Sequence, residues 1–148
     1  ARAVIPSIIT QVLDGADQVR LGSLHPTRDF SYVVDTVKGF IAVAESDRSV
    51  GQILNVGSSF EISIGDTAQV IMEAVGREVE VVCDKERTRP ENSEVERLWA
   101  DTTKVREMAG WSPSFSGLEG FRRGISETVA WFDSAENRES YKSGVYNL

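Results

Sequence analysis

Short segments with a strand pattern alternate along this chain with longer segments whose apolar residues recur at helical spacing. This alternation constrains the fold most, because interleaved strands and helices build mixed α/β layers rather than a bundle or a sandwich. The strand-like segments are too few and too short for a complete doubly wound parallel sheet. We therefore expect an α/β (mixed α+β) fold with few short strands and about five helices, without a complete Rossmann fold.

The expected helices are bounded by recognisable start and stop signals. Gly15, Gly76 and Gly110 follow apolar-periodic segments, as glycine commonly does where a helix ends. Ser63 and Asp66 form a start that resembles a capping box. The expected apolar faces comprise Ile5, Ile9 and Val12; Val34, Val37, Ile41 and Ala44; Ile64, Ala68, Ile71 and Val75; and Leu118, Phe121, Ile125, Val129 and Phe132, with a further helix following Asp101.

Four short segments are predicted as strands, and one long segment as a loop. The strands are Val19–Gly22, a buried Gln52–Val56, Glu61–Ser63 and Glu78–Cys83. The single cysteine, Cys83, is expected to be buried as a small hydrophobic residue. Residues 84–98 are charged, contain Pro90 and have no clean periodicity, so they are predicted to form a long loop, and a loop of this length in a compact domain is usually either functional or disordered.

Composition excludes several classes of protein. The 148 residues carry a net charge of −7, which argues against a nucleic-acid-binding surface. The only histidine, His25, lies in a polar turn, and no Cys/His cluster points to a metal. No apolar run approaches the ~20 residues that span a bilayer. A lone cysteine fits a reducing compartment, so a cytoplasmic location is expected.

The motifs of a cofactor site or a catalytic site are missing. There is no Gly-x-Gly-x-x-Gly, no Gly-x-x-x-x-Gly-Lys-Ser/Thr and no Tyr-x-x-x-Lys in the sequence. We accordingly predict no catalytic, cofactor-binding or metal-binding residue in this chain. Arginines in loops remain as candidates, because a guanidinium offers phosphate a planar, bidentate set of donors: Arg28, Arg87, Arg89 and Arg97.

Five stretches, taken in order, resemble a known family. They are Val4-Ile5-Pro6, Arg28 to Asp35, Asn55-Val56-Gly57, Arg89 to Val95, and Leu98 to Pro113. Together they resemble the extended short-chain dehydrogenase/reductase family, and within it the nucleotide-sugar 4,6-dehydratases and 4-epimerases. The resemblance identifies the carboxyl-terminal, substrate-binding part, with residues 1–133 as that part and 134–148 as a tail. The family's cofactor, NAD or NADP, and its catalytic pair belong to an amino-terminal Rossmann domain.

The resemblance implies roles for particular residues. Arg28 and Arg89 match arginines that contact substrate phosphates, and Glu94 sits where relatives place an acidic residue for the ribose hydroxyls. Ala3 and Val4 fall where relatives use backbone groups near the nucleotide. Asp35 and Asp101 are interpreted as structural carboxylates at helix starts. Trp99 and Trp111 are interpreted as core residues rather than as stacking platforms.

Three functions remain open at this point. The first is the nucleotide-sugar-binding half of a 4,6-dehydratase of the GDP- or UDP-N-acetylhexosamine type, or of a 4-epimerase, inactive as this chain alone. The second is a stand-alone binding module for nucleotide-diphosphate sugars. The third is an interaction piece whose ligand site has lapsed. The first reading implies a missing Rossmann half as partner and an exposed apolar surface through which a homodimer could form.

Overall fold

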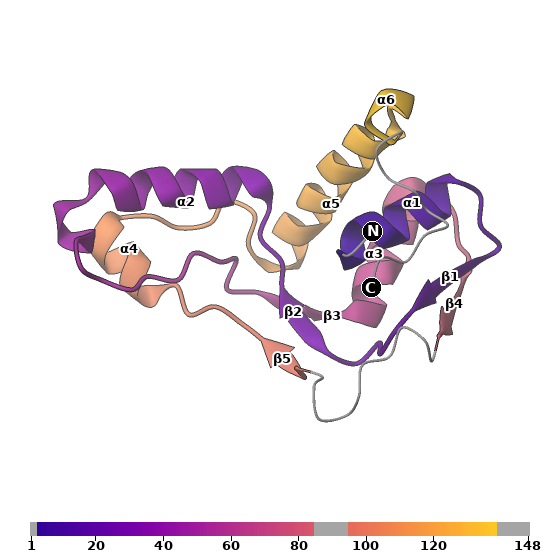
Figure 1. Cartoon of the computed structure of the whole chain (residues 1–148), viewed down its shortest axis with the longest axis horizontal. Helices are drawn as coiled ribbons and strands as arrows, with labels where there is room; N and C mark the ends of the chain where they lie inside the picture. Colours follow the sequence, from indigo (N-terminus) through magenta and orange to yellow (C-terminus); the bar gives the residue numbers. More distant parts are fainter. Residues whose placement is uncertain (1–2, 85–94, 139–148) are drawn as a thin grey trace. The chain divides into compact units, whose positions relative to one another are not determined.

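The computed structural model describes residues 3–84 and 95–138 of the chain. They form two compact units, which are described separately (Figure 1). Among the described residues, the first comprises 3–26, 63–84, 95–96 and 125–138, and the second comprises 27–62 and 97–124. Helix α5 (Gly117–Asp133) is divided between them at Gly124. The few short strands and predominance of helices agree with the predicted mixed α/β class.

In the first unit, helices α1 (Val4–Leu13) and α3 (Ile64–Val75) pack together beside a pair of parallel strands, β1 (Gln18–Leu21) and β4 (Glu80–Cys83) (Figure 1). Arg77, which follows α3, joins that helix to the end of α1, because its guanidinium donates to the carbonyl oxygens of Val12 at 3.0 Å and Gly15 at 3.1 Å. A short helix, α6 (Ala135–Arg138), follows α5. The buried apolar side chains of this unit include Ile8, Ile9, Val12, Val19, Leu21, Ala68, Ile71, Ile125, Val129 and Phe132.

The predicted bounds of α3 are confirmed, together with their physical cause. The Ser63 hydroxyl accepts a hydrogen bond from the Asp66 amide at 3.0 Å and donates one to its carboxylate at 2.6 Å. Gly76 ends the helix with φ +76°, a conformation that costs glycine little, and its N–H donates to the Met72 carbonyl at 2.9 Å. The residues expected to face the core include Ala68 and Ile71, which are fully buried.

In the second unit, strand β2 (Thr27–Asp29) lies between β3 (Glu61–Ser63) and β5 (Arg97–Leu98). Strands β2 and β5 are parallel, with Thr27 opposite Arg97 and Arg28 opposite Leu98. Helix α2 (Val33–Glu45) is followed by a 3₁₀ turn (Asp47–Ser49) and contacts α4 (Thr103–Ala109) (Figure 1).

The expected burial of one face of α2 is wrong. Val34, Val37 and Ile41 are exposed, and the buried positions of the helix are instead Asp35 and Gly39. Gly39 allows a close approach, because a Cβ there would lie 2.5 Å from Val56 Cγ1 and 3.2 Å from Trp111 Cε2. The helix therefore packs on a narrow strip centred on its glycine, whereas Val33, Val37 and Ile41 are each more than half exposed.

The predicted buried strand Gln52–Val56 is also wrong. This segment is extended but belongs to no sheet, and Ile53 is 87% exposed. A strand requires a hydrogen-bonded neighbour, and no strand within residues 3–84 and 95–138 lies alongside it. In both Gln52–Val56 and the exposed side of α2, the sequence pattern predicts burial, but no other described segment of the second unit covers the apolar side chains.

Candidate functional site

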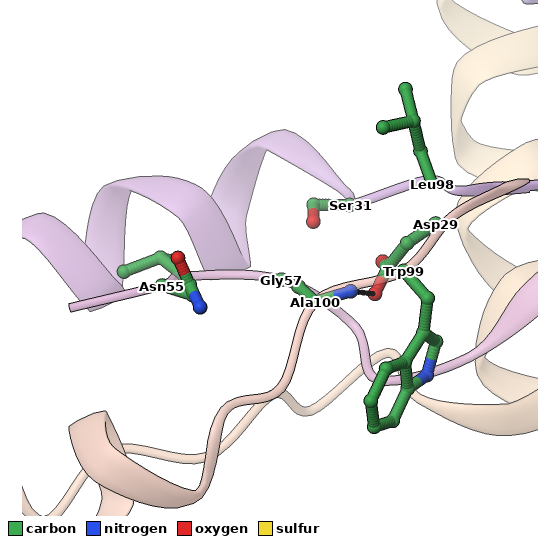
Figure 2. A pocket seen from close by; sticks show the side chains of 8 residues that line it. Asp29, Ser31, Asn55, Gly57, Leu98, Trp99 and Ala100 are labelled. Carbon is green, nitrogen blue, oxygen red and sulfur yellow. Dashed lines mark hydrogen bonds between the residues drawn. The ribbon is translucent and has the colours of Figure 1, made fainter. Parts of the chain in front are cut away.

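A shallow hollow of about 260 Å³ in the second unit brings three separate segments together (Figure 2). Its lining comes from the end of β2, from the segment before the Ser58-Ser59 turn and from the residues around β5: Asp29, Ser31, Asn55, Val56, Gly57, Leu98, Trp99 and Ala100. Three of the five stretches that resemble the dehydratases and epimerases therefore meet here. The volume lies just below that of typical ligand clefts, ~300–1,000 Å³.

The Asp29 carboxylate is the centre of this arrangement. Its Oδ1 accepts hydrogen bonds from the Ser58 amide at 2.8 Å and the Ser58 hydroxyl at 2.6 Å. Its Oδ2 accepts from the amides of Ser59 at 3.0 Å and Ala100 at 3.2 Å, the latter drawn in Figure 2. Because three of these donors are backbone groups, Asp29 fixes the path of the main chain in two segments that are far apart in sequence.

The turn around Asp29 is tightly packed. A Cβ at Gly57 would lie 2.4 Å from the Ala100 Cβ and 3.2 Å from the Asp29 Oδ2, so this position requires glycine. Ser59 has φ +55°, a left-handed conformation that is uncommon outside glycine. Its hydroxyl lies 2.6 Å from Thr102 Oγ1 and 3.2 Å from the Ala100 carbonyl oxygen. These contacts hold Ser59 in a conformation that brings its amide to the carboxylate.

Arg28, predicted to contact phosphate, lies on β2 directly before Asp29. Successive side chains on a strand point to opposite faces, so Arg28 and Asp29 lie on opposite sides of the sheet. The register pairs Arg28 with Leu98, whose side chain points away from those of Asp29 and Trp99 (Figure 2). Arg28 is half-buried, and its Nη1 donates to the Thr27 carbonyl oxygen at 2.8 Å.

Arg97 is held in an ion pair on the other face of the sheet. Its Nη2 and Nε lie 2.6 and 2.8 Å from the two carboxylate oxygens of Glu61, and its guanidinium lies 5.6 Å from the centre of the Trp99 ring. The Arg97 guanidinium, helped by the Thr27 hydroxyl, lowers the pKa of Glu61, and the same bidentate contact raises the pKa of Arg97. Arg97 is therefore part of the frame of the sheet.

The remaining predicted site residues are placed as follows. Ala3 is the exposed residue before α1, and Val4 is the half-buried first residue of that helix, both in the first unit. Arg28 belongs to the second unit. Arg89 and Glu94 lie outside the described residues.

The structural carboxylates behave as expected. Asp35 lies in the first turn of α2, is 2% exposed, and accepts the Phe115 amide at 2.7 Å. Asp101 accepts the Thr103 amide at 2.9 Å beside the start of α4, and this contact lowers the pKa of Asp101. His25 is confirmed as an exposed loop residue, and it lies 2.9 Å from Glu96.

Of the two tryptophans predicted to lie in the core, one is buried and one is not. Trp111 is confirmed as a core residue, at 7% exposure, but Trp99 is 46% exposed and borders the hollow. Trp99 directly follows the short edge strand β5, and the Arg97 guanidinium lies 5.6 Å from the centre of its ring. Sequence reasoning missed Asp29, Ser58 and Ser59 as a connected group. The Arg-Asp-Phe motif contains the signal, in its aspartate rather than in its arginine.

Metal-binding clusters and membrane-spanning helices are both absent from residues 3–84 and 95–138. No group of three or more His, Cys, Asp or Glu side chains is arranged there to hold a metal ion. Within the same residues, no helix has the length and apolar character needed to cross a membrane.

The fold and the motifs gathered around Asp29 are those of the extended short-chain dehydrogenases/reductases that act on nucleotide sugars. The chain belongs to the GDP-mannose 4,6 dehydratase family, whose model matches residues 1–124. Its sequence is 35% identical over 136 residues to UDP-N-acetyl-alpha-D-glucosaminuronate decarboxylase of Bacillus cytotoxicus, a match that covers 90% of this chain and 41% of the relative.

Solved structures agree with this assignment. Epimerase Mth375 of Methanothermobacter thermautotrophicus superimposes with a TM-score of 0.80 at 28% identity, covering 94% of this chain and 39% of the epimerase. UDP-N-acetylglucosamine 4-epimerase of Methanobrevibacter ruminantium, in complex with UDP-N-acetylmuramic acid, gives 0.72 at 27% identity, covering 88% and 39%. dTDP-glucose 4,6-dehydratase of Bacillus anthracis, in complex with NAD, shares the fold at 0.74 and 24% identity, covering 93% and 40%. The chain thus spans about two fifths of the length of these relatives.

Proposed function

We propose that this chain is the nucleotide-sugar-binding part of an NAD(P)-dependent nucleotide-sugar 4,6-dehydratase. The observation that supports this most is the placement of Arg28 on β2, beside an aspartate whose four hydrogen bonds fix the strand. A guanidinium on a fixed strand suits a diphosphate, since it offers bidentate, charge-assisted donors from a backbone that is already held in place.

The proposed ligand contacts are divided among several groups. Arg28 and Arg89 bind the phosphates, and Glu94 accepts hydrogen bonds from the ribose hydroxyls, for which two carboxylate oxygens are well suited. Backbone groups around Ala3 and Val4 lie near the nucleotide. Residues 1–133 constitute the substrate-binding part, and 134–148 a carboxyl-terminal tail.

The chemistry belongs to the rest of the enzyme. NAD or NADP, bound in that part of the enzyme, would supply reversible hydride transfer with the sugar. The residues of this chain contribute binding energy through the nucleotide, which holds the sugar in place for a reaction at a distance from the phosphates. Taken alone, the chain is catalytically incomplete, because its sequence contains neither a Tyr-x-x-x-Lys pair nor a glycine-rich dinucleotide fingerprint.

The partner that this proposal requires is a cofactor-binding domain, in the same polypeptide or in another. Unsatisfied apolar surface in the second unit supports it: Val33, Val37, Phe40 and Ile41 on α2 are exposed, and Ile53 is exposed in the unpaired segment that follows. Such a surface favours association, so the isolated chain is expected to form homodimers through it. A cytoplasmic location is part of the same proposal.

Other members of the family remain alternatives within it. A 4-epimerase part would use the same anchoring of the nucleotide, and the 35% identity to a decarboxylase favours a substrate with a UDP group. A stand-alone binding module would bind nucleotide sugars as a stable monomer. An interaction piece with a lapsed site would fold and bind none of them.

Calorimetric titration separates the functions that bind a nucleotide sugar from an interaction piece with a lapsed site, and it identifies the preferred nucleotide. UDP-N-acetylglucosamine, GDP-mannose and dTDP-glucose would each be titrated into the wild-type chain and into Arg28→Ala, Arg89→Ala and Arg48→Ala. Arg48 is the matched control, since it is exposed and donates to the Glu107 carbonyl oxygen on another part of the second unit.

Removing one charge-assisted contact costs about 1.5–3 kcal/mol, so Arg28→Ala and Arg89→Ala should each weaken binding by about ten-fold or more. Arg48→Ala should leave the affinity unchanged. A folded wild-type chain that binds none of the three ligands would refute the proposed function for the chain as it stands.

A further inference from the structure

We propose that Asp29 is a positioning residue for the phosphate-binding arginine: it fixes the strand from one face of the sheet so that Arg28 is presented on the other. The inference rests on the proposed function, because it assigns Asp29 a part in nucleotide binding without contact with the ligand. In the chain without ligand, the order of the Arg28 side chain should also depend on the Asp29 carboxylate.

Asp29 is unsuited to bind ligand itself. An ionised carboxylate has about four favourable acceptor positions. Here two donors reach each oxygen, at 2.8 and 2.6 Å for Oδ1 and at 3.0 and 3.2 Å for Oδ2. A substrate hydroxyl or amide would have to displace one of these bonds. Asp29 therefore acts through the backbone segments that it holds in place.

What it holds is the end of a very short strand. Strand β2 is three residues long, and β5 beside it is two residues long, so the ladder alone constrains β2 weakly. The Asp29 carboxylate adds bonds to the Ser58-Ser59 turn and to Ala100, which follows β5. Because Arg28 is joined directly to Asp29 and points to the opposite face, any rotation of β2 about its axis would move both side chains together.

A second layer of contacts makes the anchor rigid. The Ser116 hydroxyl donates to the Ser58 carbonyl oxygen at 2.6 Å, and Ser59 Oγ lies 2.6 Å from Thr102 Oγ1. At Gly57 there is no room for a Cβ beside Asp29 and Ala100. The donors that reach Asp29 are thus fixed by groups other than Asp29, as a positioning device requires.

A double-mutant cycle tests the coupling between the two residues. The affinity for UDP-N-acetylglucosamine would be measured for the wild type, Arg28→Ala, Asp29→Asn and the double variant, with uridine as a ligand that lacks phosphates. Asn keeps the size of the side chain but replaces one acceptor oxygen with a donor, which faces backbone N–H groups.

If Asp29 acts through Arg28, each single variant weakens UDP-N-acetylglucosamine binding by about ten-fold, the double variant weakens it by little more, and uridine is unaffected. A double variant whose affinity falls by about a hundred-fold would show that the two residues act independently. Equal losses of affinity for uridine would show a purely structural role, and either result would overturn the inference. Ser58→Ala keeps the three backbone donors to Asp29 and removes the hydroxyl, which also accepts a hydrogen bond from the Phe60 amide at 3.2 Å. It is the milder variant should Asp29→Asn melt below the assay temperature. Its smaller loss should disappear in the Arg28→Ala background.

A measurement without ligand separates this inference from the proposed function. In ¹⁵N-labelled chain, the Arg28 Nε–H resonance should broaden or shift towards a solvent-averaged position in Asp29→Asn, whereas that of Arg48 should not. An unchanged Arg28 signal in a folded Asp29→Asn chain would overturn the positioning role even if nucleotides bind. A changed signal in a chain that binds no nucleotide would uphold the coupling and refute only the proposed function.

Discussion

Two glycines in α5 offer a matched test of how the second unit is packed. At Gly120 an added Cβ would lie 2.4 Å from the Phe115 carbonyl carbon and 2.8 Å from its Cα. At Gly124, one helical turn later, the nearest atoms are the Tyr32 Cβ and Cδ2, both at 3.5 Å. Both glycines are buried in the same helix, so alanine changes the same chemistry in two environments.

The magnitudes follow from these distances. Replacing a helical glycine with alanine stabilises a protein by roughly 0.5–1 kcal/mol when the site has room. At Gly124 the contacts are ordinary van der Waals distances, so Gly124→Ala should be stabilising by about that amount. At Gly120 the clash is with backbone, which cannot move aside as a side chain can, and overpacking of this kind costs typically 1–3 kcal/mol. Gly120→Ala should therefore be destabilising by about 1–2 kcal/mol net.

Urea unfolding followed by circular dichroism would measure both variants against the wild type. With a slope of about 1–3 kcal/mol per molar urea, the midpoint of Gly120→Ala should fall by roughly 0.5–1 M, and that of Gly124→Ala should rise slightly. If Gly120→Ala matched or exceeded Gly124→Ala in stability, the close packing of α5 against the Phe115 backbone would be refuted.

Three further predictions concern charge, surface and thiol. The pKa of Glu61 is lowered in the folded state, so the ionised side chain stabilises the fold above the ordinary pKa of 4.5, and this stabilisation is lost as the pH falls through the lowered pKa. Glu61→Gln should therefore lower the thermal midpoint at neutral pH and give the same midpoint as the wild type in strong acid. A difference in midpoint that stays constant with pH would contradict this. Ile53→Lys should change the free energy of unfolding by less than about 0.5 kcal/mol, because Ile53 is exposed, but it should reduce self-association measured by sedimentation velocity. Self-association equal to that of the wild type would show that the association surface does not include Ile53. Cys83 is exposed, so a chromogenic disulfide reagent should titrate one thiol in the native chain without denaturant, and protection until unfolding would contradict that exposure.

The helices were predictable from the sequence because their signals are local. Ser63 and Gly76 bound α3 through hydrogen bonds and a backbone conformation within a few residues, and apolar spacing identifies Ala68 and Ile71 as core residues. The fold class followed from the same patterns. The family resemblance came from short motifs, three of which meet around Asp29.

The wrong predictions share one physical cause. Periodicity predicts which face of a helix or strand would be buried if a partner is present, but it does not say that the partner belongs to the same chain. The exposed face of α2 and the unpaired Gln52–Val56 both follow from this. Cys83 and Trp99 lie at the ends of short strands, where an apolar run in sequence does not ensure cover from both sides.

The arrangement around Asp29 was beyond prediction for a different reason. Its donors come from residues 29 and 71 positions further along the chain, and no pattern within a window of the sequence indicates such bonds. A charged residue in a strand next to an arginine is equally consistent with a surface ion pair. Only the three-dimensional placement reveals that the carboxylate is saturated by three backbone donors and one hydroxyl.

The central claim, that a nucleotide sugar binds at Arg28, is tested most directly by mapping the site. UDP-N-acetylglucosamine would be added to the ¹⁵N-labelled chain while the backbone amide resonances are followed to saturation. We predict saturable shifts at Thr27–Phe30 and at Arg97–Ala100, which are lost in Arg28→Ala. Shifts confined to another surface, such as α3 and β4, or no shifts from a folded chain at millimolar ligand, would contradict the account.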